Sequence, residues 1–180
     1  MIVAFDYSLS CPALCIASSP EWKDAKCWYL TDTQKYEDVF FRGQIKGSLH
    51  KEWKTQEQRY HNISEHFIKI VSQVAPNVAT VIEDYSMGST GRVFNIAENC
   101  GLIKHKLFLR DHKLTLVAPT VLKKFATGSG AADKIKMYEA FKTLTGVDLS
   151  PDLGKPGNSP MSDVIDAYFL ARYALTIKEE

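Results

Sequence analysis

The sequence predicts a single α/β domain in which helices flank a mixed sheet of five strands. Two observations carry this prediction. The first thirty residues contain three short β-rich segments separated by turn residues, which indicates an antiparallel meander. From residue 55 onward, stretches with helical spacing of apolar residues alternate with short runs of β-branched residues, as in strand–helix units. With 180 residues, 45% of them hydrophobic, residues 1–180 suit one domain with its own core.

The individual elements follow from periodicity and turn chemistry. Strands are expected within residues 2–8, 14–18 and 27–30, and residues 32–53 are polar and expected to be irregular. A helix over 55–74 carries Ile63, Phe67 and Ile70 at helical spacing. The remaining strands are expected at 78–83 and 114–117, and the remaining helices at 93–109, 119–125, 131–144 and 160–176.

Composition excludes some classes of protein and leaves others open. No apolar run approaches the ~20 residues that span a bilayer, and the N-terminus lacks the pattern of a signal peptide, so we expect a cytoplasmic protein. The four cysteines form no CxxC pair, and we expect them to be buried thiols rather than zinc ligands or disulfides.

The net charge of +1 does not by itself indicate a nucleic-acid-binding protein. Basic residues do cluster locally, for example Arg42, Lys46, Lys51 and Lys54 ahead of the first helix. Such surfaces fit contacts to a phosphate backbone. On charge alone, an ordinary solvated surface explains them better.

Four acidic residues stand at places that favour a shared site. Asp6 and Glu83 each end an apolar strand, where α/β proteins often place ligands, although strand-end acids are commonly just solvated. Asp163 and Asp166 lie three residues apart near the start of the last helix and head an apolar stripe. The helix dipole accounts for Asp163 in the first turn and less well for Asp166.

If the four carboxylates converge, their repulsion has to be offset. Hard divalent cations with oxygen ligands, Mg²⁺ or Mn²⁺, do this, and the set contains no Cys or His to favour zinc. Two such ions ~4 Å apart activate a water molecule and stabilise the leaving oxygen in phosphoryl transfer. The chemistry that follows is hydrolysis of a phosphodiester.

Four segments, in order along the chain, resemble the motifs of the RuvC family of Holliday-junction resolvases, which have an RNase H-like fold. They are IVAFDYSLSCPALCIA, VIEDYSMGSTGRVFNIAENCGLI, ATGSGAADKIKM and SDVIDAYFLARYA. The third resembles a G-x-G-x-A-x-K pattern, and the fourth a closing D-x-x-D-A helix. The long segments at 32–53 and 148–159 mark the chain as a divergent member, of the kind that phages encode and that would work in the host cytoplasm.

The resemblance implies a site and its partners. Asp6, Glu83, Asp163 and Asp166 match the family's metal-binding carboxylates and Lys134 its phosphate-contacting lysine; Lys123 falls where a second functional lysine lies. The family's aromatic wedge is replaced by Ser86, which leaves Tyr85, Met87 and Phe94 as candidates for contacting DNA, together with Arg92. The implied partners are four-way or branched DNA and a second copy of the chain, paired through residues 93–109. No membrane and no small-molecule substrate is implied.

Three functions remain open at this point. The first is a junction resolvase with two Mg²⁺ ions, for which Mn²⁺ substitutes. The second is another RNase H-like nuclease acting on RNA, RNA–DNA hybrids or flaps, because a metal site alone does not define the substrate. The third is a non-catalytic nucleic-acid-binding protein, against which the complete set of four acids argues.

Overall fold

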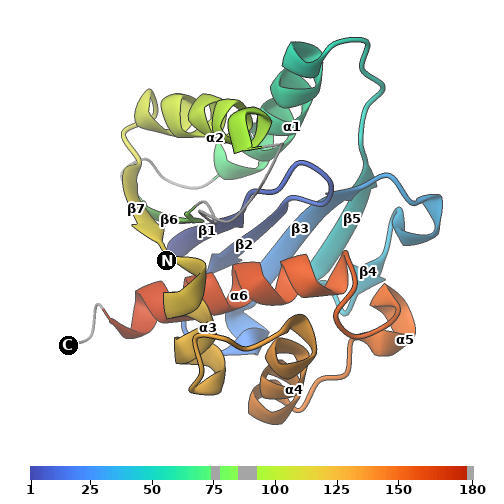
Figure 1. Cartoon of the computed structure of the whole chain (residues 1–180), viewed down its shortest axis with the longest axis vertical. Helices are drawn as coiled ribbons and strands as arrows, with labels where there is room; N and C mark the ends of the chain where they lie inside the picture. The colour runs from blue at the N-terminus through green and yellow to red at the C-terminus, as the bar shows by residue number, and fades with distance from the viewer. Residues whose placement is uncertain (74–77, 85–92, 178–180) are drawn as a thin grey trace.

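The computed structural model of the chain describes residues 1–73, 78–84 and 93–177. Within these residues, one mixed sheet has the strand order β4-β5-β3-β2-β1-β6-β7 (Figure 1). Its strands are β1 (Ile2–Asp6), β2 (Ala13–Ala17), β3 (Ala25–Thr31), β4 (Phe40–Phe41), β5 (Ile45–Leu49), β6 (Ala79–Glu83) and β7 (Lys113–Val117). The antiparallel pairing of β1, β2 and β3 and the parallel addition of β6 and β7 confirm the predicted mixed sheet.

The predicted count of five strands was wrong, because the segment at 32–53 is not irregular. It contains β5, which pairs parallel with β3, and β4, which pairs antiparallel with β5. Only one face of β5 is buried, through Ile45 and Gly47. A side chain at Gly47 would collide with the ring of Tyr29 and the carbonyl of Tyr36, so this strand needs a glycine that weakens its sequence signal.

The helices lie close to their predicted positions. They are α1 (Gln56–Val71), α2 (Val93–Phe108), α3 (Pro119–Thr127), α4 (Lys134–Thr145), α5 (Ser150–Leu153) and α6 (Met161–Thr176), with 3₁₀ turns η1 (Trp22–Asp24) and η2 (Gln34–Tyr36). Thr55 caps α1 by accepting a hydrogen bond from the Gln58 amide, and Asp133 caps α4 in the same way. The short α5 lies in a segment that was expected to be a loop.

Two hydrophobic layers cover the two faces of the sheet (Figure 1). In β1, Val3 and Phe5 pack in the layer with α1 and α2, while Ile2 and Ala4 pack in the layer with α6. This is the period of two expected for a strand that is buried on both sides. The next residue on the α6 face of β1 is Asp6.

Two further expectations concern the described residues. The four cysteines are buried and free, as predicted. Among the described helices, none combines the length and the apolar character that crossing a bilayer requires.

Candidate active site

Two of the four acids are brought together by strand register. β1 and β6 are parallel neighbours, with Phe5 opposite Ile82, so Asp6 and Glu83 end adjacent strands at the same edge of the sheet. Val81 packs in the α6 layer, and Glu83, two residues later, lies on that same face. The pairing therefore places both carboxylates next to each other and facing α6.

Helix α6 supplies the other two acids. It packs along β1 and β2, and Asp163 and Asp166 in its first two turns line the same pocket as Asp6 at the end of β1. Asp163 is 6% exposed and Asp166 is half-buried, so neither is a freely solvated residue of the helix surface. The Oγ of Ser162 donates to Oδ2 of Asp163 at 3.5 Å. The nearby side chains of Ser159 and Cys11 both lower the pKa of this carboxyl.

Two lysines face the acids from the opposite wall. Lys123 comes from α3 and Lys134 from the first turn of α4, which Asp133 caps. Nζ of Lys134 donates to Oγ of Ser162 at 3.1 Å, which holds the ammonium group beside α6. Both lysines contribute positive charge that favours the ionised forms of Glu83 and Asp166.

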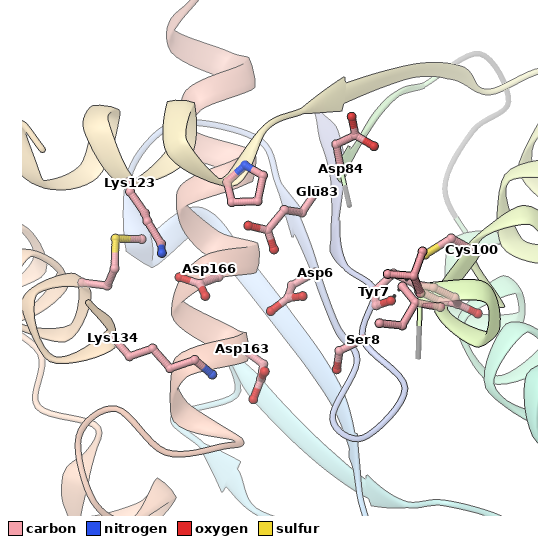
Figure 2. Close-up of a pocket in the computed structure, with 14 residues that line it drawn as sticks. Asp6, Tyr7, Ser8, Glu83, Asp84, Cys100, Lys123, Lys134, Asp163 and Asp166 are labelled. Carbon is pink, nitrogen blue, oxygen red and sulfur yellow. Dashed lines mark hydrogen bonds between the residues drawn. The ribbon is translucent and has the colours of Figure 1, made fainter. Parts of the chain in front are cut away.

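These six side chains line one pocket of about 460 Å³. Figure 2 shows the carboxylates of Asp6, Glu83 and Asp166 turned toward a common space, with Asp163 beside the end of Lys134. The carboxylate of Asp84 points away from this group. The far wall comes from the segment after β1 and from α2, through Tyr7, Ser8, Val93, Ile96 and Cys100. The site is therefore an acidic floor flanked by cationic and partly apolar walls.

Burial and mutual repulsion make ionisation of the four acids unfavourable. Burial, and then the charges of Glu83, Asp163 and Asp166, raise the pKa of Asp6 well above its ordinary value. The same causes raise the pKa of Asp166 to about 8, and burial raises the pKa of Glu83 to about 7. Burial also raises the pKa of Asp163, against the hydrogen bonds that it accepts. Ionising all four groups together is therefore unfavourable, and a bound cation would offset that cost.

The chemistry of these donors fits a hard divalent cation. All four ligand candidates are carboxylates, and Mg²⁺ and Mn²⁺ prefer oxygen ligands. Across residues 1–73, 78–84 and 93–177, however, no three His, Cys, Asp or Glu side chains are gathered tightly enough to hold one ion. Metal binding is therefore a proposal that donor chemistry and electrostatics support.

The predicted DNA contacts are less well placed. Tyr85, Met87 and Arg92 lie outside the described residues. Phe94 is 81% exposed at the start of α2 and does not line the pocket; its neighbour Val93 does. A role for Phe94 in the pocket itself is therefore not supported by its position.

Sequence reasoning missed three polar neighbours of the acids. Ser8 lines the pocket, Cys11 lies near Asp163 and lowers its pKa, and Ser162 accepts a hydrogen bond from Lys134. Ser162 and Ser8 each stand within two residues of a predicted ligand, and that proximity was the available signal. No signal in the sequence pointed to Cys11, because only the turn into the antiparallel strand β2 brings this residue near α6.

The mixed sheet, its order and the helices on both faces define an RNase H-like fold. Among solved structures, the chain is similar to Thermus thermophilus RuvC, with a TM-score of 0.64 and 13% identity over 99% of this chain and 95% of that chain. It is also similar to T. thermophilus RuvC in complex with a Holliday junction substrate, with a TM-score of 0.63 and 13% identity over 97% and 94% of the two chains. No protein-family model and no curated protein sequence matches the chain. The expected RuvC-like fold is thus confirmed, in a divergent sequence.

Proposed function

We propose that this protein is a metal-dependent endonuclease that resolves Holliday junctions and related branched DNA by paired phosphodiester hydrolysis. The observation that carries the proposal is one pocket in which four carboxylates, two buried and two half-buried, face two lysines. A site of this composition suits a phosphodiester, because cations neutralise the acids and the phosphate together. The structural likeness to a RuvC bound to a junction substrate supports the choice of substrate.

Each residue has a proposed part in the reaction. Asp6, Glu83, Asp163 and Asp166 would hold Mg²⁺, with two ions expected and Mn²⁺ able to replace them. When bound, such ions supply an activated water molecule and charge stabilisation for the leaving oxygen. Lys134 would hold the scissile phosphate, and its bond to Ser162 would keep the ammonium group in position. Lys123, and by resemblance Tyr85, Met87, Arg92 and Phe94, would contact the DNA.

Paired cuts need two active sites, and α2 offers a surface for a second copy of the chain. Phe94, Gly101, His105 and Phe108 are exposed along one side of this helix. A side chain at Gly101 would meet nothing within 4 Å, so the helix is open there to close approach. This side of α2 has an exposed aromatic residue at each end, with the acid Glu98 and the open Gly101 between them, and such a surface favours a homodimer through α2.

The test compares substrates and metals in one experiment. The protein is incubated with a synthetic four-way junction, a linear duplex, a flap and an RNA–DNA hybrid, each with Mg²⁺, Mn²⁺ or a chelator. We expect symmetric nicks in the junction with either metal and no cutting with the chelator. Preferred cutting of the hybrid or the flap would assign the site to another RNase H-like nuclease.

Asp6→Asn is the matching active-site variant. Removing this central carboxylate is expected to abolish cutting while junction binding persists, because binding depends mostly on phosphate contacts elsewhere. Asp152→Asn, at an exposed position on α5, is the control and should cut like the wild type. Substantial cutting by Asp6→Asn would count against the proposed site.

A further inference from the structure

Part of the sheet face beside α1 carries lysines instead of a helix. In β3, Trp28 and Lys26 lie two residues apart, so both point to the same side of the sheet. Trp28 is half-buried and packs at the border of the hydrophobic layer beneath α1. Lys46 of β5 is the direct register partner of Trp28 and therefore lies on the same face.

The cations on this face are exposed and gathered together. Lys26, Lys46, Lys51 and Lys69 are all exposed, and we call these four lysines with Trp28 the β3–β5 basic face. Burial, then the neighbouring His50, and then the charges of Lys51, Lys46 and Lys69 lower the pKa of His66 in α1 to about 4. Lysines from a strand, a loop and a helix thus converge on one place.

Little negative charge offsets these lysines. The β3–β5 basic face makes no ion pair within the described part of the chain. Beside it is a pocket of about 360 Å³, lined by Ile16, Lys23, Lys26 and Trp28 among others. The acid in its lining, Asp24, accepts a hydrogen bond from Oγ of Ser19 at 2.7 Å. A patch of exposed, unpaired lysines attracts polyanions through its positive potential.

The β3–β5 basic face is physically joined to the active-site edge of the sheet. Next to Lys51, Nε2 of His50 lies 3.0 Å from the carbonyl oxygen of Ser10. The Arg59 guanidinium donates to the carbonyl of Leu9 at 2.8 Å and lies 4.5 Å from the centroid of the Trp53 ring. These contacts fix the segment after β1, which follows Asp6 and carries Ser8, against the start of the basic face.

We propose that the β3–β5 basic face is a second DNA-binding surface, which holds the phosphate backbone of a duplex arm leaving the active site. The occupant is double-stranded DNA because a group of exposed, unpaired lysines is complementary in charge to a chain of phosphates. Trp28 is too deeply packed to stack between bases and forms the floor of the surface. The inference rests on the proposed function for the identity of the arm, and it adds a contact outside the catalytic pocket.

The expected effect follows from counterion release. Each lost phosphate contact lowers the slope of log K against log[salt] by about 0.9, so Lys46→Ala/Lys69→Ala should lower it by about 2. At 0.15 M salt this corresponds to a loss in affinity on the order of 10-fold or more. Cutting by saturating enzyme should stay at the wild-type rate, since neither lysine lines the catalytic pocket.

The experiment measures binding to a linear 30-base-pair duplex and to a four-way junction by fluorescence anisotropy, at several salt concentrations without divalent metal. The matched control is Lys113→Ala/Lys124→Ala, which removes two exposed lysines elsewhere and gives the same net charge. Lys46→Arg/Lys69→Arg should bind like the wild type, because it keeps both charges. Thermal unfolding of each variant shows whether the fold is intact.

The outcomes separate this inference from the proposed function. Weaker DNA binding and a smaller salt slope for Lys46→Ala/Lys69→Ala, but not for Lys113→Ala/Lys124→Ala, would support DNA binding by the β3–β5 basic face. This would hold even if junctions were never cut. Equal affinity of this variant, its control and the wild type would overturn the inference, whereas junction cutting would still stand. A wild-type protein that binds no DNA would overturn both.

Discussion

Replacing Asp166 by asparagine should make the metal-free protein more stable at high pH. Asp166 is held beside Glu83 and Asp163, and burial with these two charges raises its pKa from 3.8 to about 8. In the unfolded chain the carboxyl returns to its ordinary pKa. Between pH 3.8 and about pH 8, the Asp166 carboxyl therefore keeps its proton in the folded protein but has lost it in the unfolded chain.

The sign and size of the effect follow from that difference. Below about pH 4 the carboxyl is protonated in both states and contributes nothing. As the pH rises toward 8, the folded state is progressively disfavoured, and the full cost is reached above pH 8. Each pKa unit corresponds to about 1.4 kcal/mol of folding free energy. Because the four acids titrate together, only part of the shift belongs to Asp166. We therefore expect Asp166→Asn to raise the free energy of unfolding by roughly 3 kcal/mol at pH 8 and by almost nothing near pH 4.

Urea unfolding of the wild type and Asp166→Asn between pH 4 and pH 8.5, with a chelator present, measures this difference in the free energy of unfolding. Asp148→Asn is an informative control because hydrogen bonds from Lys142 and Ser150 hold the pKa of Asp148 below its ordinary value. That variant should lose stability at neutral pH, the opposite sign. If Asp166→Asn were less stable than the wild type at pH 8, its carboxylate would be a favourable structural group and the electrostatic reasoning would be refuted.

Three further changes test other parts of the site and its surroundings. Lys134→Ala should slow single-turnover cutting by roughly 10- to 100-fold while weakening junction binding much less. Equal losses in rate and affinity would show that Lys134 only helps to bind the DNA. Arg59→Ala removes a hydrogen bond and the contact with Trp53, so urea unfolding should show a loss of about 1–3 kcal/mol, partly recovered by Arg59→Lys; an unchanged midpoint would contradict the contacts. Gly101→Arg should give folded monomers in sedimentation velocity while the control Glu139→Arg stays dimeric; a persistent dimer, or a monomeric wild type, would argue against pairing through α2.

The acidic site was predictable because its geometry follows from local rules. An acid at the end of an apolar strand continues the alternation of that strand, which places Asp6 on the α6 face after Ala4. Asp163 and Asp166 share one side of a helix because they are three residues apart. What the sequence could not supply is the distance between these groups, which depends on how α6 lies along β1.

The edge of the sheet was missed for a different reason. β5 pairs parallel with β3 through a connection that passes η2 and β4, and its polar pattern is not that of a buried strand. Parallel pairing is a non-local interaction that leaves little trace in one segment alone. The β3–β5 basic face depends on the same register, since only the pairing of Trp28 with Lys46 shows that they share a face.

Contacts between distant segments were also beyond prediction. Arg59 bonds to Leu9 and Lys134 bonds to Ser162, pairs separated by 50 and 28 residues. A charged residue on a helix gives no sign of which carbonyl or hydroxyl it will reach, because many surface positions satisfy it equally well. These contacts nevertheless fix the segment after β1 and the lysine opposite the acids.

The central claim is that the four carboxylates form one divalent-cation site, and calorimetric titration of Mn²⁺ into the protein tests it most directly. The wild type should bind up to two ions per chain at pH 8, and Asp6→Asn should bind at least about 10-fold more weakly. Identical Mn²⁺ binding by the two proteins, or no binding by either, would contradict the claim.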